Sequence, residues 1–216
     1  MQVNRTRRLR QLALIPLLAA LGGGLLSACA PLMVGGMVGT AMVATDRRTS
    51  GTQVEDQGIE LKAGKRLADK LGDRVHISVN SYNRQVLLTG ETRNEEDKAE
   101  AERIVAEVEN VGRVVNEVQV GFISSLSSRS NDVLVAGKIK ASLVDARDLI
   151  SNAFYVVVER GEVFMLGRVT EREANRATEI ARGVSGVKKV VRLFEIISEE
   201  ELARTAPKPP KPSESR

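Results

Sequence analysis

The composition of this 216-residue chain argues against several kinds of chemistry. It holds no Trp, two Tyr, four Phe and a single His, which leaves little material for stacking on nucleobases or for His-based catalysis. Its formal net charge is +4, but four N-terminal arginines lie in a segment that we expect to be cleaved, so the mature chain sums to zero. We therefore expect a binding protein that is not an enzyme, with no cofactor, no metal site and no nucleic-acid partner.

The first thirty residues have the order of a bacterial lipoprotein signal. Four arginines precede the apolar run LALIPLLAALGGGLL, and the sequence L-S-A-C then ends at Cys29, the only cysteine. The charge, length and small-residue ending are typical of a secretory signal peptide. The L-S-A-C sequence resembles a lipobox, whose cysteine receives a diacylglycerol. We predict that residues 1–28 are removed, that Cys29 carries the lipid and that residues 29–55 form a flexible tether.

An alternative is that residues 12–44 cross the membrane as one helix, since about 20 apolar residues suffice. Several glycines and Pro31 make this segment a poor continuous helix. By the lipobox resemblance Ala30, which is not aspartate, implies sorting to the outer membrane. We therefore predict a protein anchored by Cys29 to the periplasmic face of the outer membrane.

The remainder of the chain repeats one pattern, in the order helix, strand, strand, helix, strand. We place the two copies at residues 56–121 and 131–198, joined by a Ser-rich linker at 122–130. The Pro- and Lys-rich end, 199–216, is expected to be a disordered tail. The first copy is net acidic and the second net basic, so the second is the better candidate for an anionic partner.

Each copy opens with a predicted helix and hairpin. Asp56 and Asp132 are expected to be helix N-caps, and aliphatic residues follow them at every fourth position, which places them on one helix face. Alternating apolar residues then predict two strands, with turns at Asn83-Arg84 and Arg160-Gly161.

Each predicted hairpin ends in a glycine and leads to a second helix. Gly90 and Gly167 stand where a backbone bend or close packing would exclude a side chain. Thr92 with Glu95, and Thr170 with Glu173, are spaced as capping boxes. The helix between the second and third strands favours parallel pairing. We predict an α+β fold in which each copy is a mixed three-stranded sheet with two helices on one face.

These features together resemble the BON domain. They are the Asp-x-x-aliphatic helix, the hairpin ending in Gly, the capping-box helix and the G-V-K-x-V-V strand at 186–191. With the lipobox in front, the chain is similar to dual-BON outer-membrane lipoproteins. The resemblance implies an α-β-β-α-β order in both copies and a role in envelope integrity, including osmotic stress and cell division. Asn110 departs from the pattern, because the second copy has Gly186 there.

No residues form a predicted catalytic or metal-binding set. His76 stands in an alternating strand without a second His or a reduced Cys pair, so we expect a solvated strand residue. The acidic run from Glu95 to Glu102 occupies the first turns of a helix, where carboxylates complement the helix dipole.

The two copies differ most on their first helices. On a helical wheel, Leu134, Lys138 and Ala141 fall outside the core-facing sector, and Gly58 stands in the first copy where the second has Leu134. An apolar side chain beside Gly137 and Lys138 suits a shallow contact with a membrane. The alternative is that Leu134 packs against the linker or the first domain.

In dual-BON lipoproteins the first helix of the second domain is associated with anionic phospholipid. The resemblance therefore implies binding of phosphatidylglycerol or cardiolipin, and we predict that this site consists of Val133, Leu134, Gly137, Lys138 and Ala141. The rival interpretation is a protein-interaction scaffold for outer-membrane assembly or cell-wall remodelling factors.

Overall fold

The computed structural model describes residues 46–205, and both copies of the repeat belong to one compact unit of the chain. The predicted signal peptide, Cys29 and most of the tether lie outside the described residues. No helix between residues 46 and 205 is long and apolar enough to cross a membrane.

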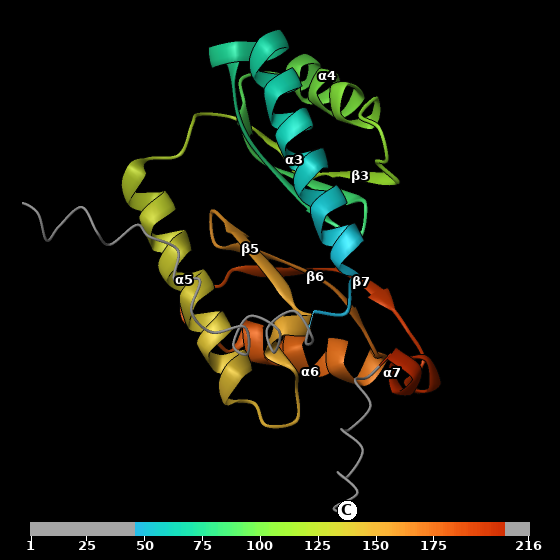
Figure 1. Ribbon diagram of the computed structural model, residues 1–216. Coiled ribbons are helices and arrows are strands. Elements are labelled where there is room, and N and C mark those ends of the chain that lie inside the picture. The colour runs from blue at the N-terminus through green and yellow to red at the C-terminus, as the bar shows by residue number, and fades with distance from the viewer. Residues whose placement is uncertain (1–45, 206–216) are drawn as a thin grey trace, which may run out of the picture. The chain divides into compact units, whose positions relative to one another are not determined.

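The first domain follows the predicted order of elements (Figure 1). The elements are α3 (Ser50–Leu71), β1 (Val75–Tyr82), β2 (Gln85–Thr92), α4 (Glu95–Ala106), β3 (Arg113–Asn116) and the short β4 (Gln119–Val120). Strand β2 is central, because it pairs antiparallel with β1 and parallel with β3 and β4. The predicted mixed sheet is confirmed, and β4 adds a fourth strand to it.

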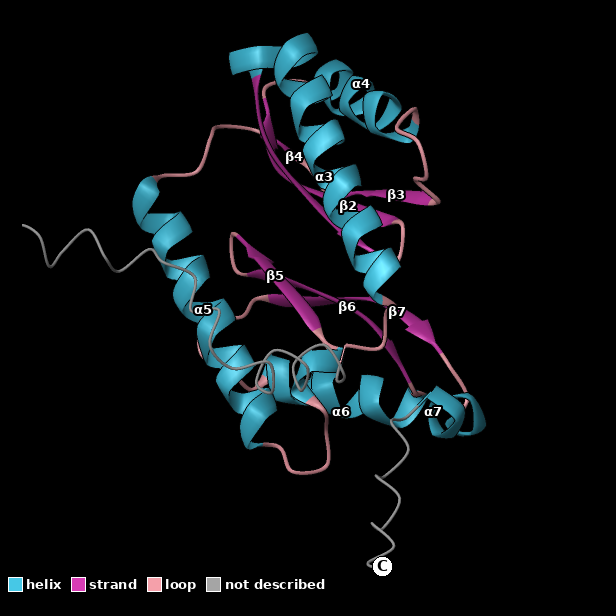
Figure 2. Ribbon diagram, viewed as in Figure 1, coloured by secondary structure: helices cyan, strands magenta, loops and turns pink. Residues whose placement is uncertain are grey.

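The second domain repeats this arrangement (Figure 2). Its elements are α5 (Leu126–Asp145), β5 (Tyr155–Glu159), β6 (Glu162–Val169), α6 (Glu171–Arg182), β7 (Lys189–Ile196) and α7 (Glu199–Thr205). Strand β6 pairs antiparallel with β5 and parallel with β7. The predicted α-β-β-α-β order is therefore present in both domains.

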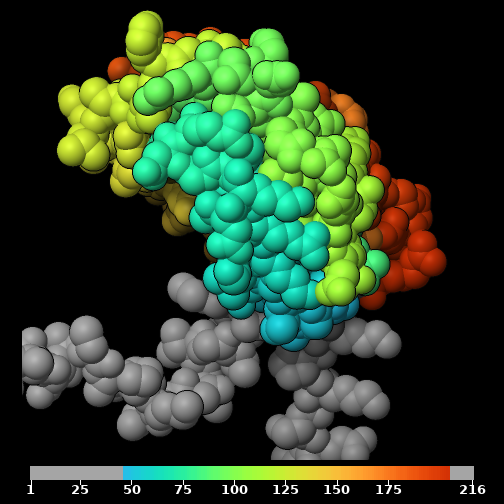
Figure 3. Space-filling view, turned by 90° about the horizontal axis from the view of Figure 1, so that it is seen from above, coloured from blue at the N-terminus to red at the C-terminus, as the bar shows by residue number. Residues whose placement is uncertain are grey.

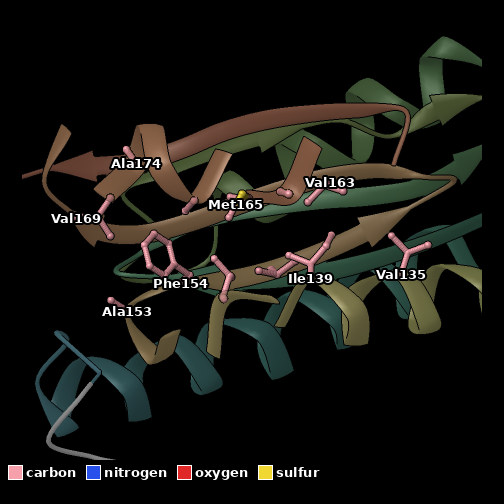
Figure 4. Close-up of a cluster of buried hydrophobic side chains, with 12 residues drawn as sticks. Val135, Ile139, Ala153, Phe154, Val163, Met165, Val169 and Ala174 are labelled. Carbon is pink, nitrogen blue, oxygen red and sulfur yellow. The ribbon is translucent and has the colours of Figure 1, made fainter. Parts of the chain in front are cut away.

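Each domain has its own core between its two helices and one face of its sheet. Figure 4 shows the second of these cores, in which Val135 and Ile139 of α5 belong to one cluster with Met165 of β6 and with Phe154, which directly precedes β5. The equivalent core of the first domain contains Ile59 of α3 and Leu88 of β2, among others. The aliphatic residues at every fourth position thus face the sheet, as their spacing predicted.

The opposite faces of the two sheets share a third apolar cluster. Tyr82 and Leu87 from the first domain lie in it together with Phe164 and Leu166 from the second. These residues alternate along their strands with the residues of the helix-covered faces, as successive side chains of a strand must. The two domains therefore contact each other through the sheet faces that carry no helices.

The prediction that Asp56 and Asp132 are N-caps is wrong. The N-caps are Thr49 and Ser125, whose side chains accept from backbone N–H groups three residues later. Both helices consequently begin six residues before the aspartates. The added turns contain no buried residue, so they lack the core-facing apolar residues whose spacing predicts the rest of each helix.

The two aspartates instead hold the hairpin turns. Buried Asp56 accepts from the backbone N–H groups of Asn83 and Arg84, each at 2.8 Å. The buried Asp132 accepts from those of Arg160 and Gly161, each at 2.9 Å. All four turn residues have positive φ, and successive N–H groups in such turns form a concavity that binds anions. We call these two arrangements the aspartate locks.

Three predicted segment boundaries also need correction. Residues 50–55 of the tether belong to α3, residues 126–130 of the linker belong to α5, and residues 199–205 of the tail form α7. Thr49 and Ser125 supply caps for the first two helices. Helix α7 begins with three glutamates, which complement its dipole, and Glu201 forms an ion pair with Arg168 at 2.7 Å.

One of the two predicted capping boxes is present. Thr170 Oγ1 accepts from the N–H of Glu173, whose carboxylate accepts from the N–H of Thr170. In the first domain Thr92 still belongs to β2, and Asn94 caps α4 by accepting from the N–H of Asp97. The predicted box from Thr92 to Glu95 is therefore wrong, because the cap lies two residues further along the chain.

The two strand glycines lie inside β2 and β6 rather than at their ends. A Cβ on Gly90 would collide with the carbonyl oxygen of His76, and one on Gly167 with that of Ala153. Each glycine thus permits a close backbone approach, as predicted. Asn110 has φ +67° where Gly186 has +99°, so the departure from glycine still keeps a left-handed turn.

Candidate functional site

Helix α5 is held on the second domain by one buried face. Val135, Ile139 and Leu143 are each buried within the core of that domain. Asp132, one turn earlier on the same helix, adds the aspartate lock to the β5–β6 turn. The orientation of α5 is therefore fixed, and so is the set of side chains that it presents to solvent.

The five predicted site residues all lie on the solvent side of α5. Val133 is 72% exposed and Leu134 is 64% exposed. Lys138 and Ala141 are exposed as well, and exposed Gly137 has open space around its Cβ position. Because Leu134 is exposed and has no place in the cluster between the domains, the alternative that it packs against the first domain is wrong.

The structure extends this surface beyond the predicted residues. At about 100° per residue, two further exposed apolar residues, Leu126 and Val144, fall in the same sector of α5. We define the α5 stripe as Leu126, Val133, Leu134, Gly137, Ala141 and Val144. At about 1.5 Å per residue its ends lie about 27 Å apart. Leu126 was missed because the helix was expected to begin later, although the spacing of both added residues was visible in the sequence.

Two lysines without carboxylate partners border the α5 stripe. Lys138 lies on one side of it and Lys140 on the other, and within residues 46–205 neither forms an ion pair. On α3, by contrast, Lys62 pairs with Glu109 at 2.7 Å and Lys65 with Asp69 at 2.8 Å. The ammonium groups of α5 are therefore available to an external anion.

The corresponding surface of α3 is interrupted by polar residues. Gln57 stands at the position of Val133, Gly58 at that of Leu134 and Lys65 at that of Ala141. Leu61, at the position of Gly137, is nevertheless 76% exposed, and Val54 is exposed one helix turn before Gln57. The first domain thus has isolated exposed apolar residues, whereas in the second domain Val133, Leu134, Gly137, Ala141 and Val144 follow one another along α5, with Leu126 beyond the exposed Ser130.

The segment that leads into α5 adds further apolar surface. Phe122 is 96% exposed, and with Ile123 and Arg93 it lines a cavity of about 600 Å³. Figure 3 shows the yellow-green residues around the start of α5 projecting at the edge of the view. The Ser-rich composition of this segment predicted only a linker, and the exposure of Phe122 was not predicted.

A second cavity, of about 220 Å³, lies beside Val133 of the α5 stripe. His76, Arg129 and Glu159 also line it. His76 is half-buried there rather than fully solvated. Among residues 46–205 no three His, Cys, Asp or Glu side chains are grouped so that they could hold a metal ion.

Glu159 in this cavity should make stability depend on pH. Burial raises the pKa of Glu159, and the charges of Glu91 and Asp132 raise it further, against the opposing effect of Arg129 and Arg160. A carboxyl whose pKa is higher in the folded than in the unfolded state costs stability once it ionises, so the cost grows as pH rises through the two pKa values.

We accordingly expect Glu159→Gln to raise the Tm relative to wild type at pH 7, with the difference vanishing below about pH 4. Thermal melts followed by circular dichroism across this pH range would measure it. Glu179→Gln, on the exposed side of α6, is the control and should shift the Tm little. A lower Tm for Glu159→Gln at pH 7 would contradict the expectation.

Comparisons with known proteins match both copies of the repeat. A family model described as "BON domain" matches residues 55–121 and 131–198. Outer membrane lipoprotein DolP of Haemophilus influenzae is 37% identical over 175 residues, which cover 80% of this chain and 90% of that protein. The 21 kDa hemolysin of Actinobacillus pleuropneumoniae is 30% identical over 154 residues, 70% of this chain and 79% of that protein.

A solved structure of the C-terminal domain of CdsD, a structural protein of the type III secretion system of Chlamydia trachomatis, is 14% identical. It covers 68% of this chain and 98% of its own, with a TM-score of 0.28. Both sequence relatives match stretches longer than one domain, so their similarity extends over the tandem arrangement.

Proposed function

Because the chain belongs to the BON-domain family as a two-domain member, we propose that it is an outer-membrane lipoprotein whose second domain binds anionic phospholipids. Its relative DolP is named as an outer membrane lipoprotein, and the lipobox-like sequence before Cys29 agrees with lipid attachment. In this proposal Cys29 anchors the protein at the periplasmic face, the α5 stripe contacts the bilayer, and this contact supports envelope integrity.

The observation that carries the proposal is the apolar character of α5 on its solvent side. A surface helix of a domain normally presents polar residues to water, yet α5 presents Leu126, Val133, Leu134 and Val144. Unpaired lysines border this stripe on both sides. Apolar side chains that insert at the boundary of the acyl chains, with ammonium groups beside the phosphates, are the elements of an interfacial membrane contact.

The expected strength of this contact is modest. Full burial of one leucine contributes about 2 kcal/mol, and one lysine near an anionic surface contributes about 1 kcal/mol. Two acyl chains on Cys29 would provide the stable attachment, since the helix contact alone is weak. The α5 stripe would thus orient the anchored protein and select the lipids beside it.

Vesicle binding by the unacylated mature chain with Cys29→Ser tests the proposal. Leu134→Glu removes an inserting apolar group and adds a charge that anionic headgroups repel, so we expect affinity for phosphatidylglycerol vesicles to fall at least about tenfold. Co-sedimentation would measure this. Leu61→Glu is the matched control, since it makes the same change at an exposed leucine of the other domain.

Lipid charge and salt provide a second arm of the same experiment. Binding should be weaker to phosphatidylcholine vesicles, and weaker at 1 M salt, where the Debye length is about 3 Å, than at 0.1 M, where it is about 10 Å. Equal loss of binding in Leu134→Glu and Leu61→Glu would mean that the α5 stripe is not the site. Unchanged binding in Leu134→Glu would mean the same.

A protein-interaction scaffold is the second candidate function, favoured by the first domain. Val54 and Leu61 on α3 are exposed within a net acidic domain, which would suit a basic partner of the outer-membrane assembly or cell-wall remodelling machinery. For this function, crosslinking in cells should recover one dominant protein, and Leu61→Glu should abolish the crosslink without changing vesicle binding.

A further inference from the structure

The residues just before α3 contact both domains. Arg47 donates from Nη1 and Nη2 to the two carboxylate oxygens of Glu173 on α6, at 2.7 and 2.8 Å. Its Nη1 also donates to the carbonyl oxygen of Arg168 on β6, at 2.8 Å. Arg48, the next residue, pairs instead with Asp56 of the first domain, at 2.8 Å.

Arg48 is fixed from several sides within the first domain. Besides Asp56 it binds the carboxylate of Asp46, and its guanidinium lies 4.2 Å from the centre of the Tyr82 ring. Such a cation–π contact adds to the ion pairs. The contacts of Arg48 therefore hold the backbone of the neighbouring Arg47 against the first domain, while the side chain of Arg47 binds the second domain.

The pair between Arg47 and Glu173 is buried. The side chain of Arg47 is 7% exposed and that of Glu173 is 4% exposed. Burial opposes ionisation of Glu173, but the hydrogen bonds from Arg47 and from the N–H of Thr170 outweigh it and lower the pKa of this carboxyl. Removal of one partner of such a pair leaves an uncompensated buried charge, which strongly destabilises the arrangement.

The other polar contacts between the domains are longer or more exposed. Arg160 reaches Glu91 at 3.4 Å, and Gln119 reaches Glu162 at 3.4 Å. Asn83 donates to Glu195 at 2.6 Å, but on the exposed surface. Within the described part of the chain, Arg47 and Glu173 form the one buried, bidentate ion pair that joins the two domains, and bidentate geometry adds both strength and direction.

We propose that residues 46–49 are a strap that holds the second domain in one orientation against the first, through the ion pair between Arg47 and Glu173. Contacts between domains of a chain ordinarily permit relative motion unless the interface is large and hydrophobic. The apolar cluster between the sheets supplies attraction, and the strap fixes the angle.

Distance measurements between spin labels on the two domains test this proposal. Labels would be placed on the mature Cys29→Ser chain at Lys65→Cys and Glu179→Cys, two exposed positions on α3 and α6. We expect a narrow distance distribution in this background. Added Arg47→Ala should widen the distribution at least about twofold, because domain motion is the default without the buried pair.

Two further variants separate the strap from a general loss of stability. Arg47→Lys keeps the charge but loses the bidentate geometry, so its distribution should be intermediate. Arg192→Ala is the matched control, because Arg192 also binds the start of α6, at Glu171 and Asn175, but from within the second domain. Its distribution should stay narrow. Far-UV circular dichroism would verify that each variant is folded.

The carboxyl of Glu173 gives an independent readout by NMR titration. Its pKa should rise in Arg47→Ala and stay low in Arg192→Ala. A distribution in folded Arg47→Ala as narrow as that of the background would overturn the proposal, as would equal widening in Arg192→Ala. If Arg47→Ala does not fold, Arg47→Lys decides, and a narrow distribution there would count against the strap.

Discussion

Replacing Asp132 with Ala should lower the free energy of unfolding by about 3 kcal/mol. Asp132 is buried and is the acceptor for the N–H groups of Arg160 and Gly161. Alanine would leave both donors without this carboxylate in a turn that cannot easily rearrange, because its residues are held at positive φ. Urea denaturation followed by circular dichroism would measure the loss.

The first domain gives this prediction an internal comparison. Asp56 accepts from the N–H groups of Asn83 and Arg84, and in addition from Ser81 Oγ and from Arg48. Asp56→Ala should therefore cost more than Asp132→Ala, because it also leaves the Arg48 guanidinium without one of its partners.

Substitution of either aspartate by asparagine tests how much of its contribution to stability comes from the negative charge and how much from the position of the acceptor oxygen. Asp132→Asn keeps one acceptor oxygen, and since hydrogen bonds to charged groups are the stronger ones, it should recover part but not all of the lost stability. If Asp132→Ala unfolded at the same urea concentration as wild type, the aspartate locks would have no energetic role.

These locks illustrate what the sequence could not predict. The apolar residues at every fourth position, the turn residues of the hairpins and the helix between the second and third strands are local patterns, and from them the α+β fold of each copy was predicted correctly. A carboxylate that binds backbone N–H groups 27 to 29 residues away leaves no local pattern. Asp in front of an apolar run is also a common N-cap. The sequence therefore favoured the N-cap role, which is more frequent than the role that Asp56 and Asp132 have in the structure.

The same contrast between local and distant signals applies to the candidate site. The position of Leu134 outside the core-facing sector follows from helix periodicity and was predicted, whereas Leu126 depended on knowing that Ser125 caps the helix. The strap could not be foreseen, because Arg47 and Glu173 are 126 residues apart in sequence. Arginine in a polar segment has no periodic signature that would distinguish a buried ion pair from a solvated side chain.

Gly137→Leu should strengthen vesicle binding, which makes it a gain-of-function test of the α5 stripe. Gly137 lies between Leu134 and Ala141 along the stripe, and nothing lies within 4 Å of its Cβ position. A leucine there can enter the bilayer without disturbing the core. Full burial of this side chain is worth about 2 kcal/mol, which corresponds to about a thirtyfold gain in affinity for phosphatidylglycerol vesicles.

The substitution should also stabilise the folded protein by up to about 1 kcal/mol, because glycine disfavours a helix interior. Gly58→Leu is the matched control, since Gly58 lies in α3 with equally open space. It should give a similar gain in helix stability but little gain in vesicle affinity, because Lys65 and Gln57 interrupt that face. Equal gains in affinity for the two variants would mean that any added exposed leucine increases vesicle binding, and that α5 is not a specific site. A gain confined to Gly137→Leu would be expected only if α5 itself lies against the membrane.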